Sequence, residues 1–242
     1  MKYRLRRPEL VPTIFMLITV VLMGYLGVWQ LQRLAWKNAL IASIEQAQAQ
    51  APKDLLSYSP EQLVQAQWHN VMVTGKLLNE KELYAMPRYL DSELGYGVLT
   101  PLEVKTSGGN VYVLINRGWV APANKDPHTR AAGNPAGMVN VSGVVRSGFK
   151  KGLFTPVNNP QKNIWFWYDL PEMAKTLGLP LLPVLIDASD VVVHGAPLSV
   201  GPKPFPLEIK IRNDHLGYAI TWFAIGFIAL VMYVVYYAEK KN

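Results

Sequence analysis

His215 is the residue whose type and position point most directly to chemistry. It follows Asp214 and precedes 23 residues, Leu216 to Ala238, that contain no charged side chain. Asp214 is a suitable helix N-cap, which would place His215 in the first turn of an apolar helix. A neutral imidazole binds metal ions and haem iron, although a helix start also attracts carboxylates. His215 is therefore either a ligand or an ordinary residue at a helix boundary.

Other chemically capable side chains are expected at the same level. Tyr218 and Trp222 follow His215 at spacings of three and four residues, so a helix places all three on one face. Gln30 and Arg33 end the first apolar run, at the boundary that His215 also occupies. An imidazole, a carboxamide and a guanidinium at one level could hold a haem by its iron and its propionates. The alternative is an interfacial aromatic belt in which His215 binds nothing.

Templates for enzymes are absent from the sequence. It has no Gly-x-Ser-x-Gly, phosphate-binding loop or His-Glu-x-x-His, and His69, His128 and His194 lack metal-ligand spacing. It also has no cysteine, which excludes thiolate metal sites and covalent c-type haem attachment. We therefore expect no enzymatic activity, with an enzyme acting on haem or lipid as the remaining alternative.

Two apolar runs organise the chain. A bilayer core needs about 20 apolar helical residues, and residues 10–31 and 215–238 both meet this length. The first run is too long for a signal peptide and lacks an Ala-x-Ala site, so we expect a retained anchor. The net charge of +7 includes a basic N-terminal tail, which indicates membrane orientation rather than nucleic-acid binding.

These features predict a topology and a compartment. A cytoplasmic tail (1–9), a transmembrane helix (10–31), an extracytoplasmic domain (32–214), a second transmembrane helix (215–238) and a cytoplasmic tail (239–242) are expected. Because no amphipathic leader rich in Arg and Ser is seen, we expect a bacterial inner membrane with a periplasmic domain.

The middle segment has the pattern of an α+β domain with a mostly antiparallel, barrel-like sheet. A helix is expected to continue over 33–50, with further helices at 60–67, capped by Ser59, and at 170–177. Residues 107–110 form a hairpin turn signal, and 121–137 a long loop. Alternating apolar residues predict strands at 68–78, 83–88, 96–104, 111–120, 138–146, 164–168, 182–187 and 205–211.

Several further residues allow two interpretations. Arg117 could pair with Asp169 or hold a propionate. The aromatic run 164–168 favours core packing over stacking on a flat ligand. Lys37 shares a helix face with Arg33, so both cations could anchor at lipid headgroups or meet carboxylates of a ligand or partner.

Glycines in the first apolar run are a weaker signal. Gly24 and Gly27 would permit close approach of the second apolar helix.

Five ordered motifs resemble the Surfeit locus protein 1 family, membrane assembly factors of haem–copper cytochrome oxidase. The resemblance covers nearly the whole chain, and we identify the chain as similar to bacterial members. One departure from the family pattern is Ala121, because proline is expected directly after Val120. The motifs are Leu26-Gly-Val-Trp29-Gln30-Leu-Gln-Arg33-Leu-Ala-Trp-Lys37, Gly95-Tyr-Gly-Val-Leu-Thr-Pro-Leu102, Val113-Leu-Ile-Asn-Arg117-Gly-Trp-Val120, Trp165-Phe-Trp-Tyr-Asp169 and Asn213-Asp-His215-Leu-Gly-Tyr218-Ala-Ile-Thr-Trp222.

This resemblance implies an assembly factor that assists haem a delivery or insertion into the catalytic subunit of a haem–copper oxidase. It assigns the haem iron to His215 and makes haem a the expected cofactor. Besides the catalytic subunit, haem a synthase and the lipid bilayer are expected partners. The alternative is an interaction factor or accessory subunit that stabilises an oxidase intermediate without binding haem. The other expected cofactor-binding residues are Tyr218, Trp222, Gln30, Arg33 and Arg117.

Overall fold

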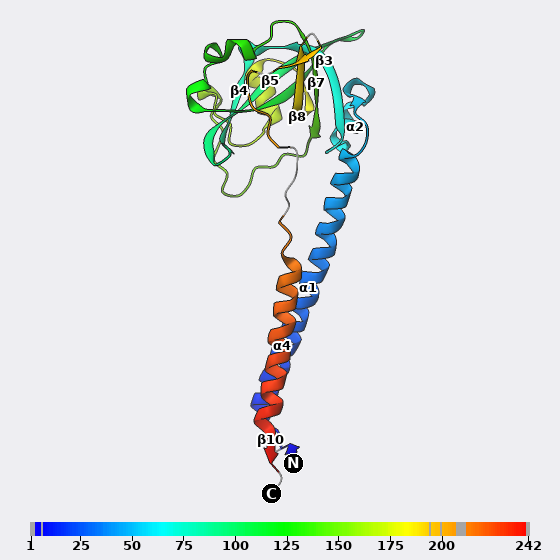
Figure 1. The fold of residues 1–242 in the computed structure, drawn as a ribbon, viewed down its shortest axis with the longest axis vertical. Coiled ribbons are helices and arrows are strands. Elements are labelled where there is room, and N and C mark those ends of the chain that lie inside the picture. Colours follow the sequence, from blue (N-terminus) through cyan, green and yellow to red (C-terminus); the bar gives the residue numbers. More distant parts are fainter. Residues whose placement is uncertain (1–2, 6, 194, 199, 207–211, 241–242) are drawn as a thin grey trace. The chain divides into compact units, whose positions relative to one another are not determined.

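The computed structural model describes residues 3–5, 7–193, 195–198, 200–206 and 212–240 (Figure 1). The chain divides into two compact units. One comprises Met1–Ile44 with Lys210–Asn242, and the other is Glu45–Ile209. We call them the helical unit and the sheet domain, and each is described by itself.

The helical unit consists mainly of two long helices. They are α1 (Leu10–Gln48) and α4 (His215–Tyr237), and both are long and apolar enough to cross a membrane. In the most apolar stretch of each helix, only 6% of the residues of α1 and 11% of those of α4 are buried. Most of these side chains therefore face outward, as lipid contact requires. The helices are therefore compatible with a membrane protein. The continuation of the first helix is also confirmed, because α1 runs without interruption to Gln48.

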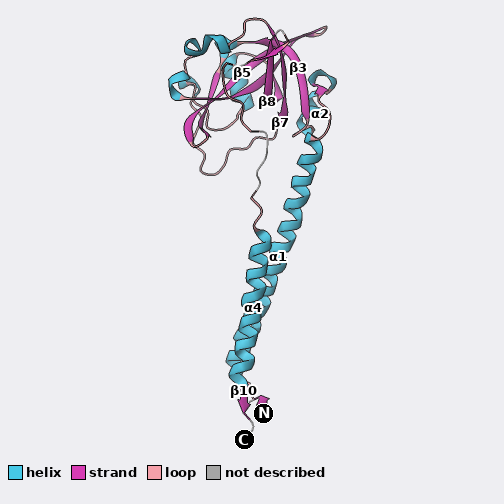
Figure 2. Ribbon diagram, viewed as in Figure 1, coloured by secondary structure: helices cyan, strands magenta, loops and turns pink. Residues whose placement is uncertain are grey.

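The helices run antiparallel (Figures 1 and 2). The hydroxyls of Thr13 and Tyr233 lie 2.6 Å apart at one end, and Gly27 packs against Phe223 further along. A Cβ on Gly27 would lie 2.5 Å from the Phe223 ring, whereas one on Gly24 would have nothing within 4 Å. Of the two predicted glycines, Gly27 therefore makes the close approach. Short strands at the chain ends, β1 (Tyr3–Leu5) and β10 (Ala238–Lys240), also pair antiparallel.

The sheet domain contains one eight-stranded sheet in the order β2-β3-β7-β8-β6-β5-β4, with β9 on β8. An additional pairing of β3 with β5 makes the sheet ring-like. The strands are β2 (Lys53–Asp54), β3 (Asn70–Leu77), β4 (Leu83–Leu90), β5 (Glu93–Thr106), β6 (Gly109–Val120), β7 (Met138–Arg146), β8 (Leu181–Val193) and β9 (Ala196–Pro197).

The expected sheet requires a correction. Two pairings are parallel, β2 with β3 and β6 with β8, so the sheet is mixed rather than mostly antiparallel. After α3 (Leu170–Leu177), β8 inserts between β7 and β6, and it runs antiparallel to the first and parallel to the second. Residue alternation identifies a strand but not its neighbours, which explains the difference.

The core follows the alternation of these strands. In β3 (Asn70–Leu77), every second residue from Val71 to Leu77 is buried, and the residues that alternate with them are exposed. Around α3, Met173 and Trp165 are fully buried in a second apolar cluster.

The short helix α2 (Pro60–Gln65) begins with the predicted Ser59 cap, which forms a capping box with Gln62. The 3₁₀ turns are η1 (Leu55–Ser57), η2 (Asn79–Lys81), η3 (Pro122–Asn124), η4 (Pro127–Gly133) and η5 (Pro160–Lys162).

Three other expectations meet different outcomes. The strand at 164–168 is wrong, because only Ile164 and Trp165 form isolated bridges, to Asn159 and Ala85. The hairpin turn is confirmed, since Thr106 pairs with Gly109 across it. Of the strand expected at 205–211, residues 205–206 are irregular and 207–211 lie outside the described residues.

Candidate functional site

His215 opens α4 in contact with Gln30 of α1. Its Nδ1 lies 2.5 Å from Oε1 of Gln30, a side chain that is 8% exposed. A carboxamide oxygen only accepts, so Nδ1 donates and carries the ring proton. In the neutral imidazole this leaves a lone pair on Nε2, to which no described residue donates a hydrogen bond. Histidine ligands of metals usually have this arrangement, in which one ring N–H donates a hydrogen bond to the protein and the other nitrogen binds the metal.

The segment before α4 is held against α1 at two more places. Lys37 Nζ donates to the carbonyl oxygen of Arg212 at 2.5 Å, and Asn213 Nδ2 donates to Asn38 Oδ1 at 2.8 Å. Lys37 thus bonds a backbone carbonyl here rather than a carboxylate. These bonds limit the freedom of the chain that leads into His215, which helps to hold the imidazole in place.

Asp214 is the N-cap residue, as predicted, but its side chain makes no capping hydrogen bond. It accepts from Nε of Arg212 instead, and this hydrogen bond and the carboxylate charge raise the pKa of the exposed Arg212 guanidinium.

The other predicted residues of this unit make no hydrogen bond to His215 or Gln30. The guanidinium of Arg33 is exposed and stacks 4.0 Å from the ring centroid of Trp36. Tyr218 is 53% exposed and Trp222 is half-buried, and neither side chain hydrogen-bonds a described residue. The structure therefore joins the imidazole and the carboxamide by a hydrogen bond, whereas the side chains of Arg33, Tyr218 and Trp222 have no hydrogen-bond partner among the described residues.

Arg117 lies in the sheet domain, and of its two interpretations the pairing with Asp169 is wrong. Its side chain is 1% exposed and pairs with Glu82 at 3.2 Å, while Asp169 caps α3 by accepting from Glu172 N. Burial lowers the pKa of Arg117 to about 10, although the charge of Glu82 opposes the shift. A propionate would have to displace Glu82 from Arg117, so the geometry favours a structural role.

Glu82 is the centre of a buried polar cluster that the sequence did not indicate. Its carboxylate also accepts from Arg130 and from the Tyr84 hydroxyl, the latter at 3.1 Å. Burial, followed by the charge of Glu82, raises the pKa of Tyr84 well above its usual range. Because 35 residues separate Glu82 from Arg117 and 48 separate it from Arg130, no local pattern could reveal the cluster.

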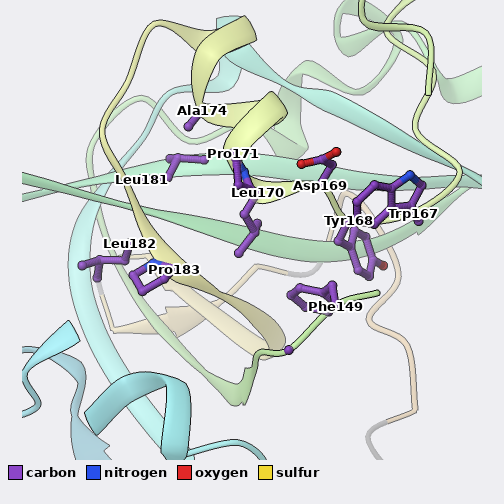
Figure 3. A pocket seen from close by; sticks show the side chains of 11 residues that line it. Phe149, Trp167, Tyr168, Asp169, Leu170, Pro171, Ala174, Leu181, Leu182 and Pro183 are labelled. Atoms are coloured by element: carbon purple, nitrogen blue, oxygen red, sulfur yellow. The ribbon is translucent and has the colours of Figure 1, made fainter. Parts of the chain in front are cut away.

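The aromatic run is divided between the core and a pocket. Trp165 is fully buried, as the core interpretation expects, whereas Trp167 and Tyr168 line a pocket of about 430 Å³ together with Phe149 and Leu170 (Figure 3). The rings of Phe149 and Tyr168 meet edge to face, 5.0 Å between centroids. This pocket was not predicted, and the density of aromatic residues was its one signal.

Among the described residues of the helical unit, His215 supplies the one imidazole that could bind a metal. Within the described part of the chain, no three His, Cys, Asp or Glu side chains gather where they could hold a metal ion. A bare metal ion would lack ligands, but haem iron takes four from its macrocycle and needs only an axial one. The donor at His215 therefore fits haem better than a free ion.

The fold and this site define a class of protein, in which a sheet domain lies in sequence between two candidate membrane-spanning helices, one opening with an oriented imidazole. The chain matches the model of the SURF1 family over residues 17–227, and it belongs to that family. The resemblance seen in the ordered motifs is thus confirmed.

Several known proteins are similar in sequence to most of this chain. A SURF1-like protein of Monosiga brevicollis is 37% identical over 231 residues, covering 90% of this chain and 84% of that protein. Surfeit locus protein 1 of Homo sapiens is 33% identical over 229 residues, covering 88% of this chain and 73% of that protein. The corresponding rat protein is 34% identical over 214 residues, covering 83% and 67%. Since these relatives are eukaryotic, the bacterial origin stays a prediction.

Proposed function

We propose that this chain is a membrane-anchored assembly factor of a haem–copper oxidase that assists delivery of haem a to the catalytic subunit. Family membership supports the oxidase role, and the Gln30-oriented imidazole of His215 carries the haem part of the proposal. The chain would act as a carrier without enzymatic activity. Its setting would be a bacterial inner membrane with the sheet domain in the periplasm.

In this proposal each residue has a defined task. His215 would hold the haem iron through Nε2, while Gln30 keeps the proton on Nδ1 and fixes the ring. The exposed guanidinium of Arg33 is free of carboxylate partners among the described residues and can neutralise propionates. Tyr218 and Trp222 supply aromatic surface on the same helix. When bound, haem a supplies the redox-active iron centre that the oxidase requires.

A second candidate function is an interaction factor that stabilises an oxidase intermediate without haem. The observation that favours it is the pocket lined by Phe149, Trp167 and Tyr168, which offers an aromatic docking surface on the sheet domain. The catalytic subunit would then be the main partner, and haem a synthase a neighbour in the same pathway.

The test is to purify the full chain from cells that make haem a and to measure haem per protein. We expect His215→Ala to lose haem, while His128→Ala, at an exposed histidine of the sheet domain, retains it. Equal and equally tight haem occupancy in His215→Ala would reject the ligand assignment.

A second arm separates the two functions. Co-purification with the catalytic subunit is measured in cells that cannot make haem a. Full association there, together with no haem on the isolated chain, would favour the interaction factor.

A further inference from the structure

A turn in the sheet domain presents two apolar side chains to solvent. Leu153 and Phe154 lie at its centre, and Thr155 N donates to Gly152 O at 3.1 Å to close it. The two side chains are 91% and 93% exposed, which exceeds every other large apolar side chain that the structure describes. Even Val11, on a candidate membrane-spanning helix, is 77% exposed. Solvent exposure of this degree is costly unless the side chains have another environment.

The turn projects from a fixed base. At one side, Phe149 packs edge to face against Tyr168, with 5.0 Å between ring centroids. At the other, Asn158 accepts from the backbone N–H of Phe166 at 2.8 Å and donates to the carbonyl of Trp167 at 3.2 Å. The apolar tip, which we define as residues 148–157, is thus held at both ends while its centre stands free.

The charge of the apolar tip is of one sign. Lys150 and Lys151 are both exposed, and residues 148–157 contain no Asp or Glu. Apolar side chains flanked by lysines are typical of segments that enter the boundary between headgroups and acyl chains, where the cations meet anionic lipids. Lysine stems also extend along apolar surface while the ammonium stays in water.

We propose that the apolar tip inserts Leu153 and Phe154 into the interfacial region of an anionic bilayer. In sequence, the sheet domain lies between two helices that are long and apolar enough to cross a membrane, so a bilayer is the surface to which it would be tethered. A stable protein interface buries about 800 Å² per partner, far more than one convex turn supplies, whereas lipids need no matching surface. The inference is independent of haem binding and of oxidase assembly.

The test uses the full chain, which has no native cysteine and so accepts a single labelled one. Phe154→Cys carries an environment-sensitive fluorophore, and the chain is reconstituted into vesicles. One set contains phosphatidylcholine alone and the other equal parts phosphatidylcholine and phosphatidylglycerol. The matched control is Ser107→Cys, at the exposed turn between β5 and β6.

In the anionic vesicles we expect the label at position 154 to shift to shorter wavelength and to be quenched by nitroxide attached to lipid. The label at position 107 should report water in both sets. Adding Lys150→Gln and Lys151→Gln should remove most of the extra quenching that phosphatidylglycerol produces.

Two results would overturn the proposal. One is a label at position 154 that is as water-exposed as the label at position 107 in anionic vesicles. The other is burial that increases with the ratio of protein to lipid, which would identify a second copy of the chain as the partner. Adding His215→Ala should leave the quenching unchanged, so failure of the haem proposal would not affect this outcome.

Discussion

The Nδ1 atom of His215 lies 2.5 Å from the Oε1 atom of Gln30, although 185 positions separate the two residues in the chain. The contact joins the first residue of α4 to a side chain in the middle of α1. Since the carboxamide oxygen can only accept, the contact selects one tautomer of the imidazole and frees Nε2 as a donor to a metal.

Removing this contact should weaken haem binding without removing the ligand. For Gln30→Leu we expect affinity to fall by about 10- to 100-fold, the usual effect of losing the partner that orients a metal-binding histidine. Haem titration of the detergent-solubilised full chain measures it. The control is Gln32→Leu, at an exposed residue two positions along α1. Wild-type affinity in Gln30→Leu would show that the contact does not orient a haem ligand.

The close approach of α1 and α4 at Gly27 can be tested by adding a methyl group. Gly27→Ala would place a Cβ 2.5 Å from the Phe223 ring, so we expect a loss of about 1–3 kcal/mol of stability in detergent. Phe223→Ala should relieve the clash in the double variant, which a double-mutant cycle measures. Gly24→Ala is the matched control, since a Cβ there meets nothing within 4 Å. Equal effects at the two glycines would contradict the packing.

Neutralising Glu82 should destabilise the sheet domain. In Glu82→Gln the buried guanidinium groups of Arg117 and Arg130 lose their counter-charge, and breaking such a buried pair costs about 3–5 kcal/mol. Chemical denaturation followed by fluorescence measures the free energy of unfolding. For Glu80→Gln, at an exposed position of the same turn, we expect a change within about 0.5 kcal/mol. Similar values for the two variants would argue against the buried cluster.

Tyr84 should make stability sensitive to alkaline pH. Its pKa is raised above the ordinary value of 10.0, mainly by burial and then by Glu82, so the folded state keeps the phenol proton where the unfolded state loses it. The stabilisation is complete below pH 10 and decreases as the pH rises above it.

We therefore expect Tyr84→Phe to lose less unfolding free energy than the wild type between about pH 10 and 12. The opposing contribution of Arg117, whose pKa is lowered to about 10, is shared by both proteins. Tyr89→Phe, at a residue 62% exposed, is the control. Parallel pH profiles for Tyr84→Phe and the wild type would contradict the assignment.

Local rules were enough to predict several elements and insufficient for others. The strand at 138–146 and the helix at 170–177 have the expected bounds, and Ser59 caps α2, because each depends on neighbours a few residues away. The prediction of a strand at 164–168 was wrong because the alternation of its residues has another cause. Its alternation reflects Trp165 entering the core while Trp167 and Tyr168 line a pocket, not a sheet with two faces.

The sequence by itself determined the two apolar helices and the family, and it predicted that His215 and Gln30 lie at one level. The lengths of the apolar runs predict the helices, and the ordered motifs identify the family. The antiparallel return of the chain is enough to predict the common level. Only the tertiary structure decided that β8 enters between β7 and β6, that Glu82 rather than Asp169 meets Arg117, and that Gln30 fixes the imidazole. These contacts join residues 35 to 185 positions apart, and their selection depends on the packing of the whole fold rather than on any local pattern.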